Sequence, residues 1–479
     1  MPTGNLAEIR LIGVWRVGRF LLVLAGIARV FDVERCWRLL VMAPVSRRTV
    51  LKGAATAGAA AAGGWLSGCG ESPNLNRGAK KTLSFWAFTD TRTAWQKKAW
   101  ELYKKERNPD FEIEWLVLPY QQMHDQLLVT AQAQSGGPDI VDVEIGQFAR
   151  YIKGDVIFAD LKPKLQQMGE WDNLYHPSAT DPWSWQGKTY GVGNELNACL
   201  MSYRHDVWEK AGVNTEIATW EEFVEEARRF HRDTGDVLLD QAYLDANQWW
   251  LLTLQGGGGY FGADGKPAFN QPPGLRSLTW MQDAVKDGWS ILTPQGQSYN
   301  IALEKGKIAS LLGPSWRFSG FVQQNIPSTK GKWHLMPFPR WEAGGSRTAT
   351  WGGTGVSVLK TSDFVEEAMD FVLFEHTTTE ALMYDFAGRQ VWPTYRPAFQ
   401  ESKLNEPLEF FDNQRVGQLI NEVSPEINNA YSSPYYQEAT SALVRIGVTP
   451  AMQNLNIPPK TALTNAQNEA LDTIEFVTA

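Results

Sequence analysis

A carboxylate and an amide stand side by side at the most informative point of the chain. Asn194 and Glu195 directly follow Gly193, which loosens the backbone at that point. A short strand pattern over residues 189–192 precedes them, and an apolar strand pattern over residues 196–203 follows them. Two strands that meet at a glycine-flanked polar pair are typical of a hinge beside a cleft.

Aromatic and acidic side chains also follow the first predicted strands. The pattern predicts strands over residues 81–87, 111–118 and 139–143, with helices over residues 95–107 and 121–134 between them. This order favours a parallel sheet that binds ligands at the carboxyl ends of its strands. Trp86, Phe88 and Asp90 lie at the end of the first strand, and Glu144 follows the third.

Helix signals surround the polar pair on its carboxyl side. Gly212 ends a short helical pattern that begins at Asp206, as expected for a left-handed helix stop. Thr219 and Glu222 form a capping-box pattern, which predicts a helix over residues 220–233.

Length and composition limit the class of protein. The 479 residues are 43% hydrophobic, which suits two or three domains or one two-lobed unit. Without the first 68 residues, 36 basic and 50 acidic residues remain, so the chain is too acidic to be a good nucleic-acid binder. The 21 tryptophans imply either an unusual core or an aromatic-lined binding surface.

Cysteine and histidine spacing predicts no metal site and no cofactor. No pair among Cys36, Cys69 and Cys199 has zinc or redox spacing, and the six histidines never fall at metal-ligand spacing. Cys199 lies within an apolar strand pattern and is expected to be an inert, buried thiol.

The N-terminal region reads as an export signal that follows an upstream extension of residues 1–41. Residues 42–68 resemble a twin-arginine signal, with Arg47 and Arg48 before a small apolar run. The sequence then ends in Leu-Ser-Gly-Cys69, which looks like a lipobox. We therefore expect a lipid-anchored lipoprotein on the extracytoplasmic or periplasmic side of the membrane, held by Cys69 and a tether over residues 69–80.

Several motifs together resemble one family. They are Gly137-Pro-Asp-Ile-Val, Trp185-Gln-Gly-Lys-Thr-Tyr-Gly-Val, Ser202-Tyr-Arg-His-Asp-Val-Trp-Glu-Lys-Ala-Gly, Thr219-Trp-Glu-Glu-Phe, Gly262-Ala-Asp-Gly-Lys-Pro-Ala-Phe-Asn, Glu304-Lys-Gly-Lys-Ile-Ala-Ser and Gly313-Pro-Ser-Trp. Their order and spacing over residues 81–380 resemble the extracellular solute-binding proteins of ABC importers, in the carbohydrate-binding branch related to maltose-binding protein.

The resemblance implies an α/β fold of the two-lobed periplasmic-binding-protein type II, with hinge crossings and a central ligand cleft. It places one lobe at residues 80–194 plus 356–392 and the other at residues 197–352 plus 398–479. The crossings are expected near residues 194–197, near residues 352–355 and around residues 390–398.

The resemblance also implies a sugar site in the cleft. Sugars need aromatic platforms for their C–H faces and planar polar groups for their hydroxyls. Glu195 stands where the family carries a ligand carboxylate, and Trp316 stands where it carries a stacking ring. The expected ligand-binding residues are Trp86, Phe88, Asp90, Glu144, Asn194, Glu195, Asn247, Trp249, Trp250, Trp316, Arg317, Trp351, Trp392, Tyr395 and Arg396.

The family implies a monomeric receptor and not an enzyme. Its partners would be a sugar or oligosaccharide, the transmembrane subunits of an ABC transporter and the membrane. Three alternatives stay open. A phosphorylated polyol or other small anion could use Arg317 or Arg396, iron could use Tyr435 and Tyr436, and an exported glycoside hydrolase would need two carboxylates roughly 5–10 Å apart.

Overall fold

The computed structural model describes residues 81–293, 296–428 and 430–478. The expected extension, the signal with Arg47 and Arg48, and the tether with Cys69 lie outside these residues. Cys199 is a free, fully buried cysteine, and burial raises the pKa of its thiol well above the usual value. The prediction that this thiol is buried is therefore confirmed.

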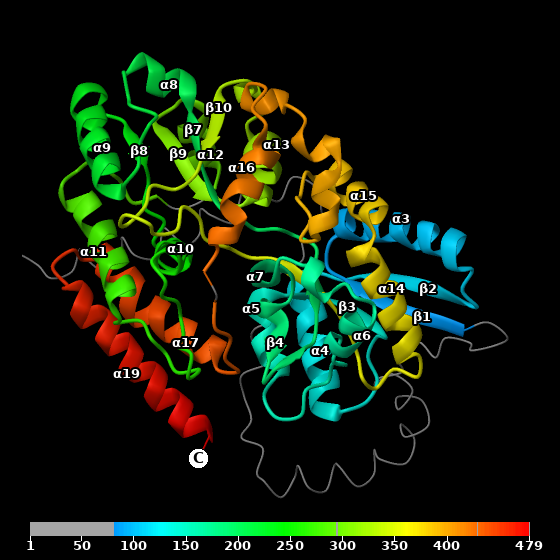
Figure 1. The fold of residues 1–479 in the computed structure, drawn as a ribbon. Helices are drawn as coiled ribbons and strands as arrows, with labels where there is room; N and C mark the ends of the chain where they lie inside the picture. Colours follow the sequence, from blue (N-terminus) through cyan, green and yellow to red (C-terminus); the bar gives the residue numbers. More distant parts are fainter. Residues whose placement is uncertain (1–80, 294–295, 429, 479) are drawn as a thin grey trace, which may run out of the picture. The chain divides into compact units, whose positions relative to one another are not determined.

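The first sheet contains the three strands of the predicted βαβαβ order (Figure 1). Its five strands run in the order β2-β1-β3-β11-β6. They are β1 (Lys81–Ala87), β2 (Phe111–Val117), β3 (Ile140–Glu144), β6 (Val192–Gly193) and β11 (Thr354–Val358). Strand β1 is parallel to both β2 and β3, as predicted, whereas β11 is antiparallel to β3 and β6. The late strand β11 therefore returns the chain to a sheet that its first segment began.

Helices and a small hairpin accompany the first sheet. They are α3 (Asp90–Arg107), α4 (Tyr120–Ala133), α5 (Ile145–Phe148), α6 (Lys162–Gln167), α7 (His176–Ala179), α14 (Val365–Thr377) and α15 (Thr379–Arg389), with hairpin strands β4 (Ser184–Trp185) and β5 (Lys188–Thr189). Helix α3 begins earlier than predicted, because the Thr89 hydroxyl accepts the Arg92 N–H and caps it. It ends where Asn108 takes a left-handed conformation with φ of 47°. Trp95 and Trp100 on its buried face share one core with Phe371 of α14 and Leu382 of α15.

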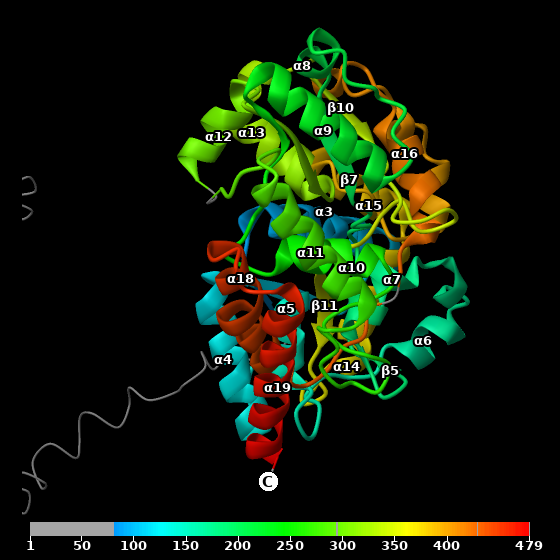
Figure 2. The same ribbon diagram turned by 90° about the vertical axis from the view of Figure 1, so that its left-hand side faces the viewer.

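The second sheet has four strands in the order β10-β7-β9-β8. They are β7 (Leu200–Arg204), β8 (Val237–Leu239), β9 (Ile308–Gly313) and β10 (Trp333–Met336). Its helices are α8 (His205–Lys210), α9 (Trp220–Thr234), α10 (Asn247–Gln255), α11 (Pro272–Lys286), α12 (Gln297–Glu304), α13 (Gln323–Asn325), α16 (Val416–Val423), α17 (Tyr436–Ala442), α18 (Thr449–Gln453) and α19 (Pro459–Thr478). A π-helical segment, Trp316–Val322, precedes α13. Helix α19 packs against α11 and α17, and Figure 2 shows it below α11, so the C-terminal helices complete this half of the fold.

Helix α9 confirms the capping-box prediction. The Thr219 hydroxyl accepts the Glu222 N–H, and the Glu222 carboxylate accepts the Thr219 N–H. Gly235 ends the helix in a left-handed conformation with φ of 75°. Trp220, Phe223 and Phe230 form its buried stripe, which fixes the helix against the second core.

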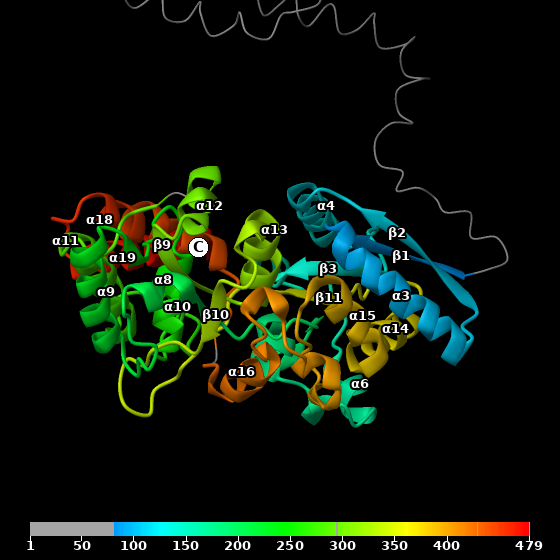
Figure 3. The same ribbon diagram turned by 90° about the horizontal axis from the view of Figure 1, so that it is seen from above.

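The chain passes between the two sheets, which lie side by side in the view from above (Figure 3). It leaves the first sheet after Gly193 and enters the second at Leu200. It returns between Met336 and Thr354. The predicted lobe boundaries stay a prediction, and the division of the strands between the two sheets supports them.

The tryptophans divide between core and cleft. Among the tryptophans that the structure describes, seven are fully buried, namely Trp183, Trp208, Trp220, Trp249, Trp289, Trp333 and Trp392. Others line the pockets described below, so the composition serves both of the purposes considered from the sequence.

Candidate ligand-binding cleft

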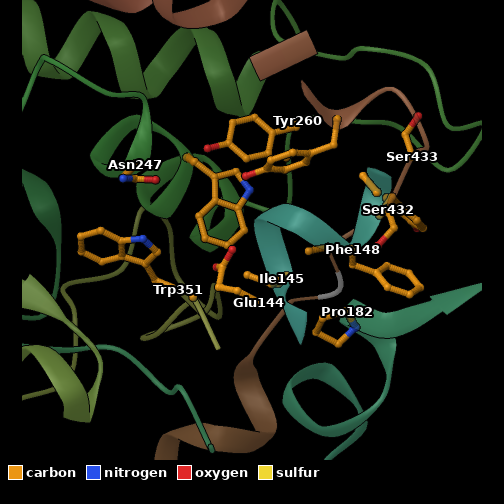
Figure 4. A pocket seen from close by; sticks show the side chains of 16 residues that line it. Glu144, Ile145, Phe148, Pro182, Asn247, Tyr260, Trp351, Ser432 and Ser433 are labelled. Atoms are coloured by element: carbon orange, nitrogen blue, oxygen red, sulfur yellow. The ribbon is translucent and has the colours of Figure 1, made fainter. Parts of the chain in front are cut away.

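A pocket with a cavity volume of about 100 Å³ lies between segments that accompany the first sheet and segments that accompany the second. It is lined by Glu144, Ile145, Phe148, Ala149, Pro182, Asn247, Trp250, Gly259, Tyr260, Trp351, Gly352, Ala430, Tyr431, Ser432, Ser433 and Tyr436. In Figure 4, Asn247 and Trp351 flank one side, Phe148 and Pro182 the other, and the Glu144 carboxylate points into the space between them. The pocket is thus a mixed aromatic and polar surface with a carboxylate at its centre.

Glu144 enters the pocket because it ends β3, as the sequence pattern predicted. Its Oε2 accepts the Gly146 N–H at 2.8 Å and the Tyr120 hydroxyl at 3.1 Å. Desolvation outweighs these two hydrogen bonds and raises the pKa of Glu144 to about 7. Glu144 is therefore a hydrogen-bonding group whose protonation changes near neutral pH.

Stacked and edge-on rings form an aromatic wall of the pocket. Trp250 of α10 stacks on Tyr260 with ring centroids 5.5 Å apart and an interplanar angle of 10°. Tyr436 of α17 meets Tyr260 edge-on, also at 5.5 Å. The wall therefore joins residues from three separate parts of the chain, and its faces suit the apolar side of a ring-shaped ligand.

A second pocket, with a cavity volume of about 120 Å³, adjoins the first and shares Asn247 and Trp351 with it. It is lined by Leu239, Asp240, Ala242, Asp245, Asn247, Gln248, Leu251, Leu312, Trp316, Arg317 and Trp351. Trp316 meets Trp351 edge-on at 5.2 Å, and its Nε1 donates to the Trp351 carbonyl at 3.3 Å. The Arg317 guanidinium lies 5.0 Å from the Trp351 ring centroid, in a cation–π arrangement.

Two charged residues that line the second pocket, Asp240 and Arg317, have polar atoms buried in the protein. Asp240 accepts hydrogen bonds from Thr293 and from the Tyr299 hydroxyl, and burial raises the pKa of its carboxyl. The Nε atom of Arg317 is buried without a protein partner in the described residues. This pocket offers acceptors and a donor together, which suits a ligand with several hydroxyls.

Glu195 and Asn194 lie elsewhere, in a buried ion-pair network beneath the first crossing. Glu195 Oε1 pairs with Arg92 Nη1 at 2.9 Å and with Arg389 Nη1 at 2.8 Å. Burial pushes the pKa of Glu195 upward, but Arg389 and Arg92 outweigh it and leave the pKa below its usual value. Asn194 donates to Asp385 in the same network. Neither residue lines either pocket, so the structure favours an architectural role over the ligand contact that we expected.

The aromatic residues at the end of β1 also stop short of the pockets. Trp86 and Phe88 are half-buried and pack against the cluster around Phe148 and Trp183. Phe88 meets Tyr120 edge-on at 5.2 Å, so it supports the residue that binds Glu144. Asp90 is exposed in the first turn of α3, where its charge suits the helix dipole.

Four other expected ligand residues contact the rest of the protein instead of the pockets; Trp249, Trp392 and Tyr395 are buried, whereas Arg396 is exposed. Trp249 is fully buried and donates to the Gly274 carbonyl at 2.8 Å, and Trp392 is fully buried and donates to the Leu404 carbonyl at 3.2 Å. Tyr395 donates to Glu170 at 2.9 Å, and the Arg396 guanidinium lies 4.3 Å from the Tyr175 ring centroid. Packing partners within the protein thus occupy all four side chains, which line neither pocket.

Sequence reasoning considered Tyr436 only for iron and did not predict that the C-terminal loop reaches the cleft. Tyr431, Ser432, Ser433 and Tyr436 line the first pocket, and Tyr260 faces them from the segment after α10. The tyrosine-rich run at residues 431–436 was the available signal, but sequence alone did not place it beside α5 or α10.

The described residues provide no sign of a membrane span, because none of their helices is both long enough and apolar enough to cross a bilayer.

Comparisons with known proteins show the family to which the chain belongs. The family described as bacterial extracellular solute-binding protein matches residues 86–374. An arabinooligosaccharide-binding protein of Bacillus subtilis is 28% identical over 84% of this chain and 95% of its own length. One of Halalkalibacterium halodurans is 27% identical over 73% of this chain and 79% of its own length.

Solved structures confirm the predicted fold class. The sugar-binding protein MalE from Xanthomonas citri superposes with a TM-score of 0.70, at 16% identity, over 83% of this chain and 99% of that one. At this identity the likeness concerns the fold, which is the two-lobed α/β architecture expected from the sequence.

Proposed function

Because the chain belongs to the bacterial extracellular solute-binding protein family, we propose that it is a receptor that binds an oligosaccharide in the cleft lined by Glu144, Trp250 and Trp351. The observation that carries this proposal is the pairing of an aromatic wall with a central carboxylate in one pocket. Rings of this kind bind the C–H faces of sugars, while carboxylate and amide groups bind their hydroxyls.

The two adjoining pockets favour a ligand of more than one sugar unit. They share Asn247 and Trp351, so one ligand can contact Glu144 in the first pocket and Asp240 or Arg317 in the second. The names of the two curated relatives make arabino-oligosaccharides the first candidates.

Titration calorimetry with arabinose, arabinobiose and arabinotriose, next to maltose and galactobiose, tests the proposal. We expect Trp250→Ala and Trp351→Ala each to weaken binding at least about tenfold, because burial of an aromatic ring contributes about 1.5–3 kcal/mol. Trp171→Ala removes a half-buried tryptophan outside both pockets and is expected to bind normally. Absence of binding across this whole panel would refute a carbohydrate ligand.

An anionic solute such as a phosphorylated polyol is the second candidate, because Arg317 leaves a buried Nε without a protein partner in the described part of the chain. Asp240 and Asp245 line the same pocket, and their carboxylates disfavour a negatively charged ligand there. Arg317→Ala separates the two candidates. A neutral sugar should lose little affinity, whereas an anion should lose about 1.5–3 kcal/mol through its charged hydrogen bonds.

A hydrolytic activity has less support. Glu144 is the one acidic residue among those lining the first pocket, whereas a glycosidase needs a carboxylate on each side of the scissile bond. Incubation with the best-bound oligosaccharide, followed by product analysis, tests this directly, and hydrolysis would overturn a pure binding role.

Delivery to an ABC permease and attachment to the membrane complete the proposed role. The Arg47–Arg48 pair and the sequence before Cys69 support export by the twin-arginine route and lipidation of Cys69. We expect the native protein, a monomer in size-exclusion chromatography, to fractionate with membranes and Cys69→Ala to release it. Recovery of both forms in the soluble fraction would contradict lipid anchoring.

A further inference from the structure

Three side chains that can ligate a metal converge at the edge of the second sheet. His205 begins α8, His334 lies in the edge strand β10, and Asp412 caps the turn after residues 409–411. Their potential ligand atoms all lie within 4.8 Å of one another. Figure 1 shows β7, β10 and α8 together at this end of the sheet. None of the three residues lines either cleft pocket.

The carboxylate of Asp412 already faces both imidazoles. Its Oδ2 lies 3.2 Å from His334 Nε2 and 3.9 Å from His205 Nε2. The two imidazole rings lie 4.2 Å apart, at an interplanar angle of 24°. All three side chains remain partly accessible to solvent, so an ion can reach them.

Hydrogen bonds to the backbone hold the three segments together. The Gln414 side chain accepts the Leu335 N–H at 2.8 Å and donates to the Leu335 carbonyl at 2.7 Å, as a neighbouring strand would. The Gly331 N–H donates to the Phe410 carbonyl at 3.0 Å, and the His205 N–H donates to the Lys332 carbonyl at 3.1 Å. The turn that carries Asp412 is therefore fastened to the strand that carries His334.

We propose that His205, His334 and Asp412 form a binding site for a divalent transition metal ion, with Zn²⁺ as the principal occupant. Two imidazole nitrogens and a carboxylate oxygen are a ligand set that zinc takes, with a fourth position left for water. Ligand atoms about 2.0–2.1 Å from zinc in a tetrahedron lie roughly 3.3 Å apart, which is between the two separations found here.

One hydrogen bond gives way when an ion binds. His205 Nε2 lies 2.9 Å from the Gly331 carbonyl oxygen, so a metal bound through this nitrogen would displace that hydrogen bond. Because the ion would join three segments of the second lobe, it should stabilise the folded protein without acting on the sugar cleft.

The spacing of these three residues in the sequence did not indicate that they form a cluster. The three residues come from separate segments, and only the pairing of β10 with β7 and the fastening of the 408–414 turn bring them together. The expectation that the chain has no metal site rested on local spacing alone.

Calorimetric titration of the chelator-treated full chain with ZnCl₂ tests the proposal, together with thermal melting with and without zinc. We expect one equivalent of Zn²⁺ to bind and to raise the melting temperature. His334→Gln and Asp412→Asn should each weaken zinc binding at least about tenfold, since loss of a supporting residue alone costs 10–100-fold in known sites. His231→Gln, a half-buried histidine outside the cluster, should bind zinc normally.

Two results would overturn the site. One is the absence of stoichiometric zinc binding, and the other is binding that His334→Gln and Asp412→Asn leave unchanged. Asp412 is exposed, so its variant is expected to fold even where a histidine variant does not. Oligosaccharide affinity, measured in parallel, should be the same in all variants, so failure of this site and failure of the receptor function are distinguishable.

Discussion

At the scale of single residues, the two ion pairs of Glu195 favour a role in stabilising the fold. The residue is 6% exposed, and its carboxylate joins Arg92 of α3 to Arg389 at the end of α15. Arg92 also pairs with Asp142, and Arg389 with Asp385. The network therefore ties the first crossing between the sheets to two helices of the first lobe.

Neutralising this carboxylate should destabilise the fold and spare the ligand site. We expect Glu195→Gln to lower the free energy of unfolding by about 3 kcal/mol at pH 7, because it leaves buried arginine charge less compensated. Denaturant unfolding measures this loss, and Glu114→Gln, an exposed substitution in β2, is the control. A variant with normal stability but weakened sugar binding would restore Glu195 to the ligand site.

The same network predicts the direction of a pH effect. The pKa of Glu195 is lowered in the folded protein, so its stabilising contribution is present above the ordinary carboxyl pKa and is lost as pH falls through the folded value. The stability gap between wild type and Glu195→Gln should therefore be full at pH 7 and should shrink below about pH 4. Unfolding curves at several pH values test this, and a gap that persists at low pH would contradict it.

Glu144 should make ligand binding depend on pH in the neutral range. Its pKa is raised to about 7, and sugar hydroxyls donate best to the ionised carboxylate. We therefore expect affinity to rise with pH, by up to about tenfold per pH unit below 7 and little above it. Calorimetry from pH 5 to pH 8 measures the profile. Glu144→Gln should bind more weakly and show a flat profile, and a wild-type profile that is already flat would exclude Glu144 from ligand binding.

At the scale of elements, the capping box of α9 is a local device with a measurable effect. Thr219→Ala removes the hydroxyl that accepts the Glu222 N–H, and it should lower the free energy of unfolding by about 1 kcal/mol. Thr215→Ala, an exposed neighbour outside the helix, should change it by much less. Equal stabilities for the two variants would show that tertiary packing alone fixes this helix.

Elements whose signals are local were the ones that sequence could predict. The βαβαβ order of the first sheet and the Thr219–Glu222 cap follow from patterns within a few residues. Strand β11 shows the limit, because its apolar run does not reveal that it returns antiparallel beside β3. That placement depends on the hydrogen bonds left open by β3, which only the assembled sheet defines.

In the candidate site, too, the sequence predicted some features and the packing of the fold decided others. Trp249 and Trp250 are neighbours in α10, yet successive residues of a helix point about 100° apart. Trp249 donates to the Gly274 carbonyl in the core, whereas Trp250 reaches Tyr260 in the pocket. Sequence could nominate the pair, but the packing of α10 on α11 decided which ring faces the cleft. Glu195 was ambiguous for a similar reason, since its partners Arg92 and Arg389 are remote in the sequence.

At the scale of the whole described region, one segment both lines the cleft and makes contacts that join its two sides. Helix α17 of the C-terminal segment lies against residues 149–151 near the first sheet. Gln437 Nε2 donates to the Gly146 carbonyl at 2.7 Å, and Lys153 pairs with Glu438. The same segment supplies Tyr436 to the pocket, so contacts across the cleft and contacts to its interior come from one element.

Weakening this bridge should speed the release of ligand. Dissociation from a two-lobed receptor requires the lobes to separate, so contacts that join them retard it. We expect the double variant Lys153→Ala/Gln437→Ala to raise the dissociation rate about 5- to 30-fold, since a partly exposed ion pair and one hydrogen bond together contribute about 1–2 kcal/mol. Stopped-flow fluorescence measures the rate. Lys360→Ala, which breaks a pair with Asp155 within the first lobe, should leave it unchanged. If both variants release ligand at the wild-type rate, closure is held by the ligand and the hinge alone, and α17 serves only to line the pocket.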